Sequence, residues 1–188
     1  QRKRRKKIRK SLEDDLGPVT FEVLPPGDEL DAAILLAVKE KSEWVDERGR
    51  HNSILGCARL PQFLSDMTRA TGHARMMMTC LKAGGQPVSW ELGLRFGTSH
   101  FGFITSHMNA LTDYSAARLH MDLSQRLALK DGMRVFDLMV PHDAHKESWS
   151  SAMMGTNDYH LPLTSAGWVG GAVLAATQGG SFELSGVP

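Results

Sequence analysis

The chain has 188 residues, of which 41% are hydrophobic and 23% charged, a balance typical of a globular protein. This length is sufficient for one domain with a full hydrophobic core. No apolar run approaches the roughly 20 residues that a helix needs to cross a bilayer, so we expect no membrane span. No signal peptide is visible, which favours a cytoplasmic location. Because the chain begins with Gln1 rather than Met, we expect it to be part of a longer protein.

The charge is unevenly distributed although its net value is only +1. Eight of the 22 Lys and Arg residues lie within the first ten positions, which contain no acidic residue, and the remainder carries a net charge of −7. Such a basic segment can bind nucleic acid or an anionic membrane surface. It has no aromatic residue that would stack on bases, so we interpret it as the solvated surface of a linker helix and expect no nucleic-acid partner.

The first third of the chain is predicted to be mainly helical. Residues 2–16 are typical of a charged helix that ends at Gly17-Pro18, and residues 19–24 of a short strand. Asp28 is expected to cap a helix with the apolar stripe Leu30, Ile34, Val38 and Val45. After a polar loop over residues 46–58, a second helix is predicted from Leu60 to about Gly72.

From residue 74 the hydrophobic period changes from about 3.6 to 2, which indicates strands. Glycine-containing turns at 83–87 and 97–99 separate three alternating segments, so residues 74–108 are predicted to form an antiparallel meander. A loop over 109–114 leads into a helix over 115–130 and a strand over 133–139. The single helical crossover makes the last two strands parallel neighbours. A short helix over 145–152, a strand over 159–163 and a glycine-rich helix over 167–178 complete the prediction.

Three groups of residues are candidates for chemistry. Ser115-Ala116-Ala117 opens a helix with small side chains, a place where backbone N–H groups can bind a phosphate, and Arg118 can add charge there. The alternative is that Ser115 is only an N-cap. Asp137 lies in an apolar strand, where a carboxylate is either paired with Lys146 or Arg134 or exposed in a cleft.

Histidines form the third group. His107 ends a predicted strand and is a candidate base, with a hydrogen-bonded structural residue as the alternative. His142, Asp143 and His145 lie close together and are followed by His160, but no motif of a known metal site includes them, so we expect no metal. The chain also lacks a phosphate-binding loop, a dinucleotide fingerprint and a hydrolase nucleophile elbow.

In order and spacing, these motifs resemble the GNAT-like acetyltransferases of bacterial cellulose and exopolysaccharide biosynthesis, the CelD-like family. The resemblance extends over nearly the whole chain. The motifs that carry it are Gly17-Pro18-Val19-Thr20-Phe21, Gly84 to Val88, Ser115 to Ala117, Gly132 to Asp137, His145 to Trp149, and Asp158 to Leu163. The chain departs from the family where Ala116-Ala117 replaces Pro-Gly and where His145 replaces the aromatic residue before the lysine.

The resemblance implies an α/β (α+β) GNAT-like fold, a mainly antiparallel mixed sheet with two splayed parallel strands around a crossover helix. Residues 1–17 would be a basic linker helix and residues 18–188 the acyltransferase domain, preceded in the full-length protein by another GNAT-like half. The implied reaction moves an acetyl or other acyl group from acyl-CoA to an amine or hydroxyl of a sugar or small molecule. The pyrophosphate of the donor would bind Ser115, Ala116, Ala117, Arg118 and Leu119.

The resemblance also implies roles for side chains near the reacting atoms. Asp137, Lys146, His145 and His107 are the candidate catalytic residues, and Lys146 with Trp149 would contact the acceptor. Two other functions stay open: a Fem-like aminoacyl transfer from tRNA, favoured by the basic run, and a non-catalytic scaffold in polysaccharide assembly, favoured by the departures from the family.

Overall fold

The computed structural model describes residues 2–50, 52–140 and 144–155, with a few isolated positions between 164 and 173. The chain divides into two compact units, residues 1–149 and 150–188, and the fold described below is that of the first unit. The strand predicted over 159–163 lies outside the described residues, as does most of the helix predicted over 167–178.

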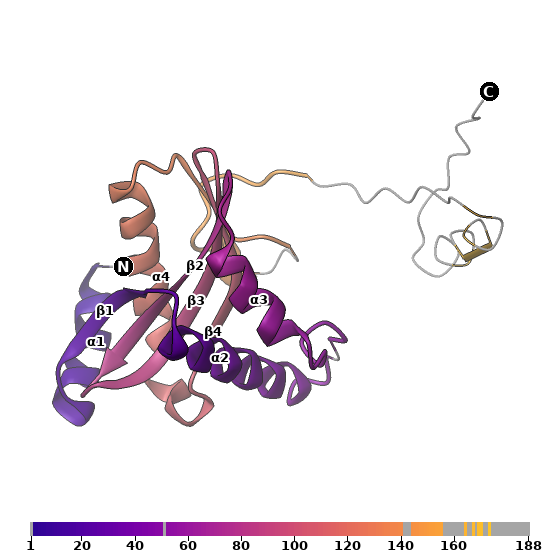
Figure 1. Ribbon diagram of the computed structural model, residues 1–188. Coiled ribbons are helices and arrows are strands. Elements are labelled where there is room, and N and C mark those ends of the chain that lie inside the picture. Colours follow the sequence, from indigo (N-terminus) through magenta and orange to yellow (C-terminus); the bar gives the residue numbers. More distant parts are fainter. Residues whose placement is uncertain are drawn as a thin grey trace. The chain divides into compact units, whose positions relative to one another are not determined.

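One five-stranded sheet forms the centre of the first unit (Figure 1), with the strands in the order β1-β2-β3-β4-β5. The strands are β1 (Val19–Leu24), β2 (Ala74–Ala83), β3 (Gln86–Phe96), β4 (Ser99–His107) and β5 (Val135–Asp137). Each of the first four pairs antiparallel with its neighbour, whereas β5 runs parallel to β4. The predicted mixed sheet with one parallel pair is therefore confirmed.

Helices cover both faces of this sheet (Figure 1). The helices are α1 (Arg2–Leu16), α2 (Asp28–Asp46), α3 (Leu60–Arg69), the 3-10 helix η1 (Asn109–Tyr114), α4 (Ala116–Lys130) and the short α5 (Ala144–Glu147). Among the described residues, no helix is both long and apolar enough to cross a membrane.

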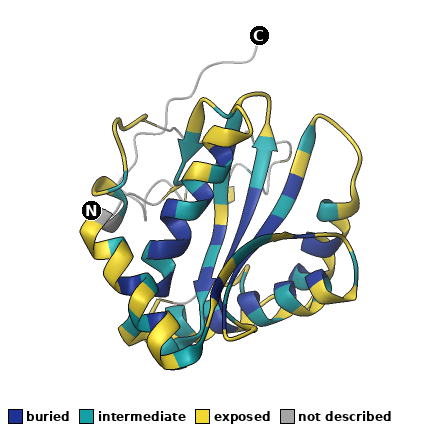
Figure 2. Ribbon diagram, turned by 90° about the vertical axis from the view of Figure 1, so that its left-hand side faces the viewer, coloured by how far each residue is buried: buried dark blue, intermediate teal, exposed yellow. Residues whose placement is uncertain are grey.

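Two hydrophobic clusters hold the helices on the sheet. On one face, α2 and α3 pack Leu30, Ile34 and Leu64 against Trp90 and Met78 of the sheet. On the other face, α1 and α4 pack against the sheet through a second cluster made of Ile8, Leu12, Val19, Leu81, Ala83, Val88, Ala116 and Leu119. Figure 2 shows the buried residues of these helices on the sides that face the sheet. Because both faces are covered, polar side chains on either face of the central strands are also removed from water.

The structure corrects four details of the predicted elements. Gly27, not Asp28, occupies the N-cap of α2, and Asp28 lies in its first turn, where its carboxylate complements the helix dipole. Residues 109–114 form η1 rather than an irregular loop. The short helix predicted over residues 145–152 extends only over Ala144–Glu147.

The fourth correction concerns β5, which extends over three residues of the predicted 133–139. The amides of Arg134 and Val135 both donate to the Thr98 carbonyl, so the strand begins only after this turn. At its other end, Met139 has a left-handed backbone with φ of 60°, and the Asp137 side chain accepts its N–H. A residue in this conformation cannot continue a strand.

Candidate active site

The parallel strands β4 and β5 separate after a short paired stretch. Ser99, His100 and Phe101 pair with Val135, Phe136 and Asp137, and β5 then ends while β4 continues to His107. A bulge follows at once in β4, because Gly102 pairs with Gly93 and Ile104 pairs with Leu92, which leaves Phe103 without a partner. A bulge bends its strand and increases the local twist. Within the described residues, the β4 edge from Gly102 to His107 therefore has no strand partner on the β5 side.

This bulge was not predicted from the sequence. The available signal was Gly102, since a glycine inside a strand often marks a bulge or a close approach of another backbone. Phe103 is 43% exposed and lies next to the point where the strands part. The bulge therefore places an apolar side chain and a free backbone edge at the same position.

Helix α4 begins just beyond the end of β4. Ser115 precedes it in a left-handed conformation, with φ of 55° and ψ of 35°, and its side chain makes no capping hydrogen bond. The Ser115 carbonyl accepts the Arg118 N–H at 2.9 Å. The five predicted donor-binding residues, Ser115 to Leu119, thus comprise the N-cap and first turn of α4. The Ser115 N–H also has an acceptor, the Thr112 carbonyl at 3.0 Å. The start of a helix leaves its first N–H groups without acceptors in the helix, and here these are the N–H groups of Ala116 and Ala117. The Ser115 hydroxyl is not used to cap them.

Asp137 and Lys146 come together at the backbone of Met139. The Asp137 Oδ1 atom accepts the Met139 N–H at 2.7 Å, and the Lys146 ammonium donates to the Met139 carbonyl at 2.9 Å. Both side chains are half-buried. The structure therefore brings this carboxylate and this lysine to the backbone of the same residue, Met139. Arg134, the other predicted partner of Asp137, is exposed.

His107 lies far from this pair. It ends β4, six residues beyond Phe101, which corresponds to about 20 Å along a strand. Its Nε2 atom is 3.4 Å from the Thr112 hydroxyl. Burial lowers the pKa of His107, and the positive charge of Lys41 lowers it further. His107 and Asp137 therefore cannot act as one catalytic pair without a large rearrangement.

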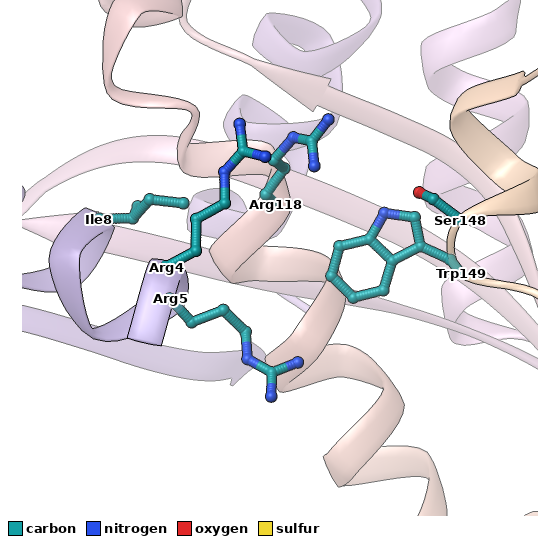
Figure 3. Close-up of a pocket in the computed structure, with 6 residues that line it drawn as sticks. All are labelled: Arg4, Arg5, Ile8, Arg118, Ser148 and Trp149. Carbon is teal, nitrogen blue, oxygen red and sulfur yellow. The ribbon is translucent and has the colours of Figure 1, made fainter. Parts of the chain in front are cut away.

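The remaining predicted residues lie around α5. His145 belongs to this helix, but its side chain lies outside the described part of the chain. Trp149 follows α5, and its backbone N–H donates to the Lys146 carbonyl at 2.9 Å. The indole of Trp149 and the side chain of Arg118 line the same pocket, together with residues of α1 (Figure 3).

A buried polar network that the sequence analysis missed lies beneath the paired part of β4 and β5. The carboxylate of Glu91 on β3 is 2.6 Å from the Nε2 atom of His100 on β4, and the residues are 2% and 3% exposed. Arg95 donates from Nε to His100 Nδ1 at 3.3 Å and binds Asp131 at 2.8 Å. Because Arg95 Nε can only donate, His100 Nδ1 must accept, so the hydrogen of His100 is on Nε2 and points at Glu91.

The charge of Glu91 is stabilised inside the protein. Burial raises the pKa of the Glu91 carboxyl, but the hydrogen bond from His100 opposes it and the net pKa lies below its usual range. The ring of His100 also stacks on Phe136 of β5, with ring centroids 4.6 Å apart. The network therefore ties β3, β4 and β5 together immediately before β4 and β5 separate.

A second buried histidine lies close by on α4. His120 is fully buried, and its Nε2 atom is 2.8 Å from the hydroxyl of Thr79 on β2. Burial lowers the pKa of His120 to about 4, so this imidazole is neutral near pH 7. Among the described residues, no group of three or more His, Cys, Asp or Glu side chains is placed to hold a metal ion.

An antiparallel meander that ends in a parallel pair, with one crossover helix and strands that part beside the start of that helix, is the arrangement of a GNAT-type acyltransferase. The family model described as an acetyltransferase (GNAT) domain matches residues 1–147. The chain therefore belongs to this family of acetyltransferases, the CelD-like family that its motifs resemble.

A solved structure shows the same fold. An aminoglycoside acetyltransferase from an uncultured soil metagenomic sample, solved with sisomicin, is 9% identical with a TM-score of 0.52, over 81% of this chain and 99% of that one. A second aminoglycoside acetyltransferase from such a sample is also 9% identical, with a TM-score of 0.49 over 78% of this chain and 99% of that one. No curated protein sequence matches the chain.

Proposed function

We propose that this acetyltransferase moves an acetyl or other acyl group from acyl-CoA to an amine or hydroxyl of a sugar or small-molecule acceptor. The observation that carries the proposal is the separation of β4 from β5 at the Phe103 bulge, beside the first turn of α4. A free strand edge offers hydrogen-bonding groups to the amides of a pantetheine arm. The start of a long helix offers N–H groups and a positive dipole end to a pyrophosphate.

In this proposal the donor lies along β4. Its pyrophosphate binds at the start of α4, within the predicted segment Ser115 to Leu119, and its pantetheine arm runs along the unpaired edge from His107 toward Gly102. The thioester carbonyl then comes near the bulge, where backbone N–H groups can stabilise the developing oxyanion. Holding donor and acceptor in one geometry contributes much of the rate.

Asp137 is the base that this arrangement favours. It pairs with Phe101, next to the bulge, whereas His107 lies at the other end of the unpaired β4 edge. The hydrogen bond from Met139 orients its carboxylate through Oδ1, so Oδ2 can take the proton of the attacking amine or hydroxyl. The Lys146 ammonium donates to the Met139 carbonyl and so lies near Asp137. An acceptor whose amine or hydroxyl reaches Asp137 can therefore place an anionic group against Lys146.

The acceptor class and the biological setting are proposed from the motifs of the family. The motif order of the CelD-like family favours a sugar-containing acceptor and a role in polysaccharide biosynthesis. It also favours a cytoplasmic protein in which residues 1–17 link the domain of residues 18–188 to a preceding GNAT-like half.

Calorimetric titration with acetyl-CoA tests the donor site. We expect the parent chain to bind, and Ser115→Glu to bind at least tenfold more weakly, because it places a negative charge where the pyrophosphate would lie. Gln125→Glu is the matched control, since it adds the same charge nearly three turns further along α4. Circular dichroism verifies that each variant is folded.

An acceptor screen then follows the release of the CoA thiol with amino sugars and neutral sugars. Thiol release that depends on an amino sugar would assign N-acetylation, and release with neutral sugars O-acetylation. If the folded parent bound no acetyl-CoA, the proposed donor site would be wrong.

A further inference from the structure

A pocket of about 290 Å³ lies between α1, α4 and the residues that follow α5. It is lined by Arg4, Arg5 and Ile8 of α1, Arg118 of α4, and Ser148 and Trp149 (Figure 3). Helix α1 thus contributes half of the lining, although the sequence analysis interpreted its basic residues as a solvated surface. This volume suits one end of a nucleotide-containing ligand rather than a complete one.

The arginines of this pocket differ in their partners. Arg5 forms an ion pair with Asp122 at 2.6 Å, and Asp122 also binds Arg126 at 3.0 Å. Within the described part of the chain, neither Arg4 nor Arg118 has an acidic partner. In Figure 3 their side chains extend toward the same side of the pocket, while Arg5 points away from them. Two guanidinium groups that share a pocket without a counter-charge repel each other, so an anion there would be stabilised.

Trp149 adds an aromatic surface and a donor to the pocket. Its indole Nε1 atom is buried and has no hydrogen-bond partner in the described structure. A buried N–H without an acceptor is costly, which indicates that a ligand atom completes it. Guanidinium groups bind phosphate through paired hydrogen bonds, and the face of an indole stacks on a flat base. Together these groups fit a phosphate monoester next to an aromatic base.

We propose that Arg4 and Arg118 bind the 3′-phosphate of the acyl-CoA donor, with its adenine against Trp149. This inference rests on the proposed function, because Arg118 lies in the first turn of α4, where the pyrophosphate is placed. In CoA the 3′-phosphate is on the ribose that follows the pyrophosphate, so a donor anchored at Ser115 reaches this pocket with its nucleotide end. The pocket therefore selects free acyl-CoA over a donor that carries only phosphopantetheine, such as an acylated carrier protein.

The test compares acetyl-CoA with 3′-dephospho-acetyl-CoA by calorimetric titration of the full chain. We expect the parent to bind acetyl-CoA about tenfold or more tightly, the effect of losing charge-assisted hydrogen bonds. Arg4→Gln should weaken acetyl-CoA binding several-fold and leave dephospho-acetyl-CoA binding within about twofold. Arg118→Gln should weaken acetyl-CoA binding by a larger factor than dephospho-acetyl-CoA binding, because Arg118 also lies beside the pyrophosphate. Lys7→Gln is the control, because it removes an exposed charge from the same helix without lining the pocket.

The outcomes separate this inference from the proposed function. Equal affinity of the parent for both donors would overturn the 3′-phosphate site but would leave the proposed donor site at Ser115 supported. An equal loss of affinity for both donors in Arg4→Gln would also overturn it, because Arg4 would then act on the pyrophosphate. If the folded parent bound neither donor, the proposed function would be wrong and this inference with it. Circular dichroism distinguishes a lost site from a lost fold.

Discussion

Glu91 Oε1 and His100 Nε2 lie 2.6 Å apart on neighbouring strands, and both residues are almost completely buried. Removing one partner of a buried hydrogen bond costs more than the bond itself contributes, because the other polar group stays buried without compensation. This relationship makes the region where β4 and β5 part sensitive to single substitutions.

We therefore expect Glu91→Ala to lower the free energy of unfolding by about 1–3 kcal/mol, the range for a buried hydrogen-bond donor left without its acceptor. Glu91→Gln should cost less, since its amide oxygen can still accept the His100 N–H. Urea denaturation measures both, with the exposed Glu47→Ala as control. A loss below about 1 kcal/mol for Glu91→Ala, within the range of a surface substitution, would contradict the prediction.

Gly93 is expected to tolerate no side chain because of the same pair. A Cβ atom there would lie 2.5 Å from the imidazole of His100 and 3.3 Å from Glu91 Oε1. We expect Gly93→Ala to cost about 1–3 kcal/mol, since the ring cannot retreat without losing its hydrogen bond. At Gly102 the nearest atom is 3.6 Å away, so Gly102→Ala serves as the matched comparison in the same denaturation experiment. Equal losses for the two variants would show that the clash with His100 is not decisive.

The turn between β2 and β3 offers a similar comparison. Gly84 and Gly85 both have positive φ values, 57° and 79°, but a Cβ at Gly84 would lie 1.9 Å from the Leu16 carbonyl oxygen, whereas nothing lies within 4 Å at Gly85. Both alanine variants carry the backbone cost of about 1 kcal/mol. Gly84→Ala should lower the free energy of unfolding clearly more than Gly85→Ala, because the end of α1 must also move away from the turn. Thermal denaturation of the two variants side by side tests this, and similar melting temperatures would exclude it.

His120 should make the protein sensitive to mild acid. Its pKa is about 4 in the folded chain against an ordinary value of 6.5, so the unfolded chain binds a proton first as the pH falls. The stability that the neutral imidazole contributes is present above pH 6.5 and is lost between 6.5 and 4, in total about 3 kcal/mol. We expect His120→Gln to flatten this part of the pH profile in urea denaturation. The exposed His73→Gln is the control, and a profile unchanged in His120→Gln would contradict the assignment.

Asp137 is predicted to limit turnover rather than donor binding. Asp137→Asn keeps an oxygen that can accept the Met139 N–H but cannot take a proton, so kcat should fall by roughly 10²- to 10⁴-fold. Affinity for acetyl-CoA, measured by titration, should stay within about threefold, a change of under 1 kcal/mol. Asp46→Asn, an exposed substitution on α2, controls for surface charge. A larger loss of kcat in His107→Gln than in Asp137→Asn would assign the base to His107 instead.

The sequence predicted most of the secondary structure because the relevant signals are local. Alternation along residues 74–107 and the glycines of the two turns predicted the meander, and the apolar stripes predicted the helices. Lys146 was one candidate partner of Asp137 because the two residues are close in the chain. The Phe103 bulge is not visible in this way, since it is a mismatch in pairing between β3 and β4.

Local patterns determined most of the helices and strands and that the last two strands are parallel, but not η1 or the short extent of β5. Tertiary structure decided which polar residues are buried, because α4 covers the face of β3 that carries Glu91 and places His120 beside it. It also decided that Arg4, near the start of the chain, shares a pocket with Arg118 and Trp149. Charge and periodicity do not show which side of a basic helix meets a distant segment, since that contact depends on packing between elements far apart in sequence.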